Sequence, residues 1–528
     1  MSLPTDDAIK LLSEPLTFPS GKTAPNRLTK AAMAEMLAQL GGSPPTPALL
    51  NLYRQWAEGG WGMIITGNVA VERSHLGMPF DVSLPHAPAP PVLSAAPGRA
   101  RGKREGASTT AMWPSSNEYA RLVQRFGTYA AACRSQKDAS ASPLSIVQLV
   151  HAGRQSIRGF GRAPWSAPLA PSAVPMRTTA ALGPWLGGLV DWALWSHPRE
   201  MSTAQIAEVV NQFAASAKLA ADAGFDGVEL HASHGYLLSA FLSPRTNRRT
   251  DGYGGSAEKR MRILLEIVDA VRQRVPSDFV VGVKLNSSDY IAGGLTEEDA
   301  LENVRILASH GGVDFVEISG GNYENPSFMG DKFDADAERD KIFGPSAPSS
   351  VSEPTPTPPP SEASSKRKKQ REAFFLSFAA RARSVSSSSS PAGQTPLRII
   401  VTGGLRSRAG MAECISAGGA DGVGLGRASV VDPHLPLRVL SGESGEDEAK
   451  VREYTIPAAG LLSKVPIQVV GAGWTTLWHT VMLHWLAHAS PPSGRQPATR
   501  TQPLNAGPLR AALIVAFGRW AVPREKEE

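Results

Sequence analysis

The chain has 528 residues, a formal net charge of +6 and a hydrophobic content of 42%. This length allows roughly two to four domains, or one α/β barrel enlarged by insertions. Two cysteines exclude a disulfide framework and a Cys-x-x-Cys metal or redox motif, so a reducing compartment is expected. The N-terminus has early acidic residues and no apolar run, so we expect no signal peptide and a cytoplasmic protein.

The positive charge is concentrated in two places. Arg99–Arg104 and Lys366–Lys369 supply much of it, and both lie beside low-complexity sequence. We therefore expect solvated surface there and no nucleic-acid partner. A nuclear import signal at Lys366–Arg371 is the alternative interpretation.

Short apolar runs alternate with helical patterns along the chain. Runs that are apolar on both faces and too short for helices predict buried parallel strands. Eight are predicted, at residues 26–33, 62–66, 145–149, 227–230, 279–285, 313–319, 398–402 and 421–425. Helices are predicted between them, at residues 47–58, 118–134, 202–223, 256–275, 296–310, 366–383 and 409–417. Ser202, Ser256 and Thr296 are predicted caps.

This alternation favours an α/β fold, a (β/α)₈ TIM barrel, over an open doubly wound sheet. The barrel is expected to span residues 16–440. Two low-complexity segments interrupt it, at 83–117 and 331–364, and we expect both to be flexible insertions. Residues 155–200 predict a long loop, either a lid or a disordered segment, and Ser386–Ser390 a flexible bridge.

Residues 441–528 are expected to be a helical extension that is partly disordered. The stretch 465–493 contains no Lys, Arg, Asp or Glu. Its apolar residues recur at helical spacing, which predicts a helix packed on the barrel: Trp474, Trp478, Val481 and Trp485. A membrane helix at 467–488 is the alternative, and Gln468 and the interspersed histidines argue against it.

Titratable residues stand at the end of the fourth predicted strand. His231, His234 and Tyr236 follow its apolar run, at the barrel end where ligands bind. Two histidines three residues apart, with a tyrosine nearby, suit substrate binding and acid–base chemistry. A purely structural role for the histidines remains the alternative.

Glycine-rich loops follow the seventh and eighth strands. Gly403-Gly404 and Gly426-Arg427 resemble the phosphate site of such barrels, in which backbone N–H groups face the anion. Tight turns without a ligand are the alternative. Gln148 would present a donor and an acceptor to the edge of a flat heterocycle. Lys284 would stabilise negative charge on such a ring, unless it reaches solvent.

These residues resemble the Old Yellow Enzyme family of FMN-dependent NAD(P)H:flavin oxidoreductases, or ene-reductases. The match runs from about Leu16 to Pro433, apart from the two insertions. It is carried by Asn26-Arg27, residues 148–154 (QLVHAGR), 231–237 (HASHGYL), 241–256 (FLSPRTNRRTDGYGGS) and 293–295, and by the glycine loops.

The resemblance implies FMN as cofactor, NADH or NADPH as reductant, and a small enone-like substrate. It implies that His231 and His234 bind the substrate carbonyl and that Tyr236 protonates its α-carbon. It places FMN against Ala32, Met33, Ala34, Gly67, Gln148, Lys284, Gly404, Gly426 and Arg427.

Three positions depart from the family pattern. Ala34 stands where relatives often have Thr or Cys beside the flavin, Lys284 where many have Arg, and Ala32 where Pro is usual. An iron–sulfur relative, such as a dienoyl-CoA reductase, is disfavoured because no cysteine cluster is present. A catalytically weakened barrel that acts as a scaffold through its insertions is the alternative function.

Overall fold

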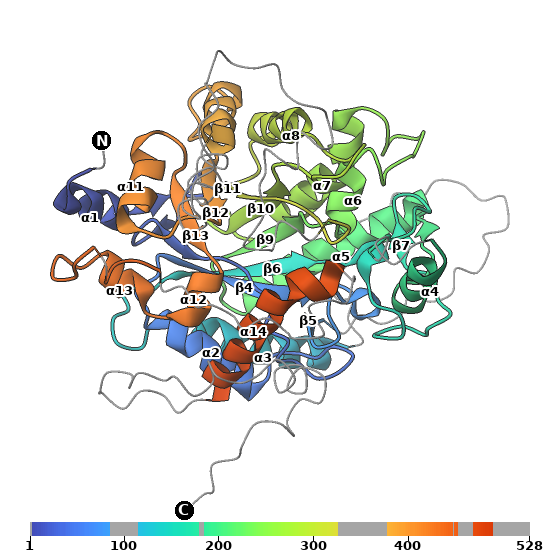
Figure 1. The fold of residues 1–528 in the computed structure, drawn as a ribbon, viewed down its shortest axis with the longest axis horizontal. Helices are drawn as coiled ribbons and strands as arrows, with labels where there is room; N and C mark the ends of the chain where they lie inside the picture. The colour runs from blue at the N-terminus through green and yellow to red at the C-terminus, as the bar shows by residue number, and fades with distance from the viewer. Residues whose placement is uncertain are drawn as a thin grey trace, which may run out of the picture.

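The computed structural model describes residues 3–84, 115–178, 184–325, 377–446, 448–451 and 468–488. Its centre is a closed barrel of eight parallel strands (Figure 1): β3 (Leu28–Lys30), β4 (Met63–Ala70), β6 (Leu144–Val150), β9 (Gly227–Ala232), β10 (Val280–Asn286), β11 (Phe315–Ser319), β12 (Arg398–Thr402) and β13 (Gly422–Leu425). The barrel closes because β3 pairs with both β13 and β4. This closure confirms the predicted TIM barrel and rules out the open sheet.

Helices surround the barrel and cover the outward faces of its strands (Figure 1). The longer ones are α2 (Pro47–Ala57), α3 (Ser116–Ala132), α5 (Thr203–Asp222), α7 (Ala257–Arg272), α8 (Glu297–His310) and α11 (Arg408–Ser416). Ser202 and Thr296 each form the predicted cap, as members of capping boxes with Gln205 and Asp299. Ser256 occupies the N-cap of α7 but forms no capping hydrogen bond through its side chain.

The barrel interior is apolar at one end and polar at the other. Phe18, which follows β1 (Leu16–Thr17), packs on Ile146, Phe315 and other inward residues at the amino-terminal end. Inward positions recur every second residue along a strand. The next inward residues on β6 and β11 are therefore Gln148 and Glu317, which begin a polar layer facing the carboxyl ends of the strands.

Several predicted strand ends differ from the structure, and two of these differences concern predicted site residues. β9 continues to Ala232, so His231 lies on the strand and pairs in register with Lys284 of β10. β4 continues to Ala70, so Gly67 lies within the strand, at a register shift between Ile65 and Asn68. The backbone N–H of Gly67 donates to the Glu35 carboxylate (2.9 Å) and the Tyr53 hydroxyl (2.8 Å), which accounts for the irregularity.

Residues 155–200 are largely structured where they are described, so the prediction of a featureless loop is wrong. They contain a 3₁₀ turn at Gly153–Gln155, the paired strands β7 (Leu169–Ala170) and β8 (Arg199–Glu200), and helix α4 (Pro184–Leu194). The buried Asp191 carboxylate of α4 accepts hydrogen bonds from the Thr178 hydroxyl (2.7 Å) and N–H (3.1 Å). Such a contact across 13 residues leaves no periodic signal.

The segment before β12 also differs from the prediction. Residues 377–389 are helical, so most of the predicted bridge Ser386–Ser390 is helix. The Ser386 hydroxyl donates to the Leu397 carbonyl (2.9 Å), which ties the helix to β12. Residues 366–376 and the insertion 331–364 lie outside the described residues. Most of the insertion 83–117 does as well, although Ser83 belongs to β5 (Val82–Ser83) and α3 begins at Ser116.

The carboxyl-terminal part adds α12 (Arg427–Val431), α13 (Leu435–Val439) and α14 (Gln468–His488). Helix α14 lies beside α2 (Figure 1), where the Asn51 amide donates to the Ala487 carbonyl (2.9 Å). Among the helices described, none is long and apolar enough to cross a membrane. The division of the chain at residue 440 stays a prediction.

Candidate active site

The structure brings the two histidines and the tyrosine together at the carboxyl end of β9. The His231 ring centroid lies 5.2 Å from that of His234 and 4.7 Å from that of Tyr236. The chain turns between them through left-handed backbone at His234 (φ 58°) and Gly235 (φ 79°). Tyr236 then begins helix α6 (Leu237–Leu242) as its N-cap. A strand end and a tight turn thus gather three titratable rings.

Both histidines are held neutral. Burial, followed by the proximity of His234 and Lys284, lowers the pKa of His231 well below its ordinary value. Burial and Lys284 lower the pKa of His234 to about 3. The backbone N–H of Ser233 donates to Nδ1 of His231 (3.3 Å), so the proton of the neutral ring resides on Nε2. His231 can therefore donate a hydrogen bond through Nε2.

Tyr236 is buried and protonated. Burial, with Tyr323 and Asp81 nearby, raises its pKa well above the ordinary value of 10. The Asn68 amide donates to its hydroxyl oxygen (3.4 Å). Burial also raises the pKa of Asp81 to about 8. Sequence reasoning missed Asn68, Asp81 and Tyr323, although Asn68 directly follows the predicted site residue Gly67.

A polar layer of four buried side chains lies one step deeper in the barrel. The Gln148 amide donates to Glu229 (2.5 Å), its register partner on the adjacent strand. The Lys284 ammonium donates to Glu317 (2.6 Å), its own register partner. Sequence reasoning found Gln148 and Lys284 but missed both carboxyl groups. Their positions in the sequence could have revealed them, because every second residue of a strand faces the barrel interior. Glu229, for example, stands two residues before His231 on the same strand.

The predicted cofactor residues at the first two strands meet one another. Ala32, Met33 and Ala34 follow β3, and all three are half-buried. A Cβ atom on Gly67 would lie 2.2 Å from the Met33 carbonyl oxygen, so β4 passes this segment at the closest approach that glycine allows. A Cβ atom on Gly426 would lie 3.7 Å from the Met33 sulfur. Strands β3, β4 and β13 therefore present these residues to one region.

The loop after β12 leaves open space. Gly403 and Gly404 adopt φ values of 111° and 83°, and no heavy atom of the described residues lies within 4 Å of the point where a Gly403 side chain would begin. Arg427 is half-buried at the start of α12. The open turn after β12 and the half-buried guanidinium after β13 fit a phosphate group, and the buried Gln148 and Lys284 side chains fit the edge of a flat heterocycle, as in FMN.

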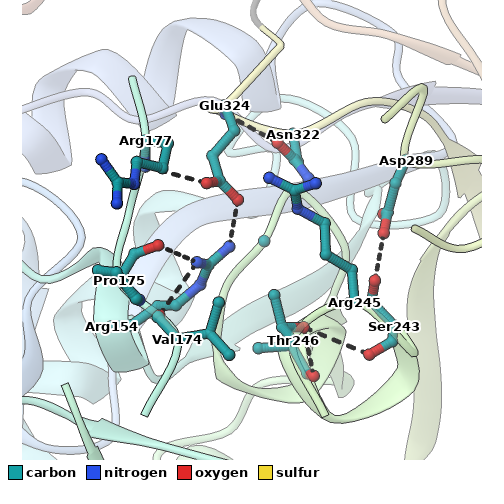
Figure 2. Close-up of polar contacts among 12 residues, drawn as sticks. Arg154, Val174, Pro175, Arg177, Ser243, Arg245, Thr246, Asp289, Asn322 and Glu324 are labelled. Atoms are coloured by element: carbon teal, nitrogen blue, oxygen red, sulfur yellow. Dashed lines mark hydrogen bonds and ion pairs between the residues drawn. The ribbon is translucent and has the colours of Figure 1, made fainter. Parts of the chain in front are cut away.

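A buried ion pair between Arg154 and Glu324, drawn in Figure 2, supports the segment next to Tyr236. Arg154 donates to the Glu324 carboxylate and to the carbonyls of Val174 (3.3 Å) and Pro175 (3.0 Å). Glu324 follows Tyr323, whose ring centroid lies 6.2 Å from that of Tyr236. The pair therefore positions the segment that covers the tyrosine.

Three further residues have the composition of a metal site. Glu72, His75 and His151 place one ligand atom each within 4.8 Å of one another. However, His75 Nε2 accepts the Leu169 N–H (3.1 Å) and His151 Nδ1 accepts the Gly153 N–H (3.1 Å). The nitrogens that face Glu72 consequently carry protons and donate to its carboxylate. A metal would need their lone pairs, so this cluster is a hydrogen-bonded support.

Comparison with known proteins identifies the family. A model of the NADH:flavin oxidoreductase / NADH oxidase family matches residues 138–323. The chain is 37% identical over 456 residues to the NADH-dependent flavin oxidoreductase iliE of Neonectria sp. (strain DH2). This alignment covers 86% of the chain and 50% of that protein. The chain thus spans half the length of this relative.

A second relative matches over nearly its whole length. The chain is 34% identical over 457 residues to iliE of Hypocrea jecorina (strain QM6a), across 86% of the chain and 95% of that protein. Among solved structures, morphinone reductase superposes with a TM-score of 0.52 at 20% identity, over 84% of this chain and 96% of that one. The likeness to morphinone reductase shows the shared barrel fold. The chain therefore belongs to the NADH:flavin oxidoreductase / NADH oxidase family of flavin-dependent oxidoreductases, in agreement with the predicted resemblance to the Old Yellow Enzyme family.

Proposed function

We propose that this oxidoreductase reduces the C=C bond of α,β-unsaturated carbonyl compounds, or a related electrophilic acceptor, with electrons from NADH or NADPH. The observation that carries this proposal is the convergence of two neutral imidazoles and one buried, protonated phenol at the barrel mouth. Neutral donors beside a proton source suit a substrate that gains negative charge at oxygen and then a proton at carbon.

FMN, when bound, supplies the hydride that reduces the substrate. We propose that the predicted cofactor residues hold it: Ala32, Met33, Ala34, Gly67, Gln148, Lys284, Gly404, Gly426 and Arg427. His231 and His234 donate hydrogen bonds to the substrate carbonyl oxygen and so polarise the alkene. Tyr236 transfers its hydroxyl proton to the α-carbon, and Asn68 holds the hydroxyl oxygen in place (3.4 Å).

The first test is an anaerobic titration of the purified protein, followed by visible absorption. NADH or NADPH should bleach bound FMN, and a panel of enones should restore the oxidised spectrum. Protein that binds FMN but oxidises neither nicotinamide would favour the scaffold alternative. Protein that cannot be reconstituted with FMN would refute the proposal.

The second test separates the histidines from the tyrosine. His231→Ala/His234→Ala should keep FMN but weaken binding of a phenol inhibitor about 30-fold, since two hydrogen bonds of about 1 kcal/mol each are lost. Tyr236→Phe should bind the phenol within about threefold of the native protein yet reduce enones at least about 100-fold more slowly. Unchanged phenol affinity in the double variant would contradict the histidine assignment.

A further inference from the structure

Lys284 is not an isolated cation in the barrel. Its ammonium lies 2.6 Å from a Glu317 oxygen, and the two side chains are only 4% and 0% exposed. Glu229 completes the surroundings of the lysine from the adjacent strand β9 and is also fully buried. Two buried carboxyl groups therefore act on one ammonium group, Glu317 through a direct contact and Glu229 through its electrostatic effect.

The charges in this layer balance. Burial and the neighbouring Glu317 raise the pKa of Glu229 well above its ordinary value. Burial acts in the same sense on Glu317, but the Lys284 charge and the hydrogen bonds of Glu229, Lys284 and Thr402 together outweigh burial and lower the pKa of Glu317. Because two adjacent carboxylates cannot both stay ionised beside a single cation, Glu229 carries a proton and Glu317 a charge. Lys284 and Glu317 then cancel each other.

We propose that Glu317 is a positioning residue that sets the electron affinity of the flavin, because its carboxylate engages Lys284 and offsets the lysine charge that would otherwise act on the cofactor. This inference rests on the proposed placement of FMN beside Lys284. A ring that gains negative charge on reduction is stabilised by a nearby cation and less so by a neutral ion pair. With Glu317 present, the flavin is therefore harder to reduce than it would be beside an unpaired Lys284.

The two carboxyl groups provide a matched pair of variants. Glu229→Gln/Glu317→Gln removes the Glu317 charge together with the second carboxyl group that could ionise in its place, and so leaves the Lys284 ammonium uncompensated. Glu229→Gln replaces a protonated carboxyl by an amide of the same shape and leaves the net charge unchanged. Both variants alter a buried hydrogen bond, so a purely structural effect would appear in both.

The experiment measures the FMN midpoint potential and the affinity for sulfite on FMN-loaded native protein and variants, without substrate. Glu229→Gln/Glu317→Gln should favour flavin reduction at least about tenfold, which is about 30 mV for a two-electron couple, and tighten sulfite binding by a similar factor. Glu229→Gln alone should change both quantities less than about twofold. Equal shifts in the two variants, or none in Glu229→Gln/Glu317→Gln, would overturn the inference.

A second double variant covers the case in which Glu229→Gln/Glu317→Gln loses FMN. Lys284→Gln/Glu317→Gln removes both charges together. The equilibrium constant for flavin reduction that follows from its midpoint potential should therefore lie within about threefold of the native value. A clearly lower potential would show that the flavin senses the lysine charge in the native protein, which overturns the inference. Failure of enone reduction with these shifts intact would instead refute only the proposed function.

Discussion

Replacing Glu324 with alanine should destabilise the protein more than most surface changes, because it leaves a buried guanidinium without its counter-charge. The side chains of Arg154 and Glu324 are only 2% and 3% exposed. Arg154 would keep its hydrogen bonds to the carbonyls of Val174 and Pro175, as Figure 2 shows. The backbone N–H of Arg177, which donates to Glu324 in the native protein (2.9 Å), would lose its acceptor.

The magnitude follows from the unpaired charge. Removing one partner of a buried ion pair costs about 3–5 kcal/mol. Glu324→Gln keeps an oxygen acceptor and the shape of the side chain, so we expect about 1–3 kcal/mol. Arg154→Met/Glu324→Leu removes both charges and should cost less than Glu324→Ala, since no buried charge is left alone.

Urea unfolding followed by tryptophan fluorescence measures these differences as shifts of the midpoint. The argument would be refuted if Glu324→Ala lowered the free energy of unfolding by less than about 1 kcal/mol, or if the double variant were less stable than Glu324→Ala. Because the pair positions Tyr323 beside Tyr236, Glu324→Ala should also slow enone reduction while FMN affinity stays within about threefold.

Two further predictions concern the same site. The pKa of Asp81, raised to about 8, lies above its ordinary value of 3.8, so its contribution to stability is complete below about pH 4 and is lost as the pH rises through 8. Asp81→Asn should therefore flatten the decline of Tm between pH 4 and 8, and an unchanged slope would contradict the assignment. Gly67→Ala would place Cβ 2.0 Å from the Glu35 carboxylate and 2.2 Å from the Met33 carbonyl, so FMN should bind at least about tenfold more weakly. Gly188→Ala, whose Cβ would meet no atom within 4 Å in the part of the chain that the structure describes, is the control, and equal FMN affinity in both variants would refute the close-approach argument.

Local sequence was sufficient to predict the barrel architecture. Strands that are covered on both faces must be apolar throughout, and helices that cover them must be amphipathic, so their alternation is visible in the chain. The capping boxes at Ser202 and Thr296 are equally local, since each involves residues three positions apart. The cluster of His231, His234 and Tyr236 was predictable for the same reason.

Tertiary structure alone decided which groups these residues meet. The pairing of strands β10 and β11 sets Lys284 against Glu317, 33 residues away, and the fold brings Tyr236 against Asn68, 168 residues away. The contact between Asp191 of helix α4 and Thr178 likewise joins residues 13 positions apart. Strand register and burial create these contacts, and neither is encoded in a local pattern. The sequence therefore determined which chemical groups the site contains, and the fold determined their protonation and charge, because burial and neighbours set each pKa.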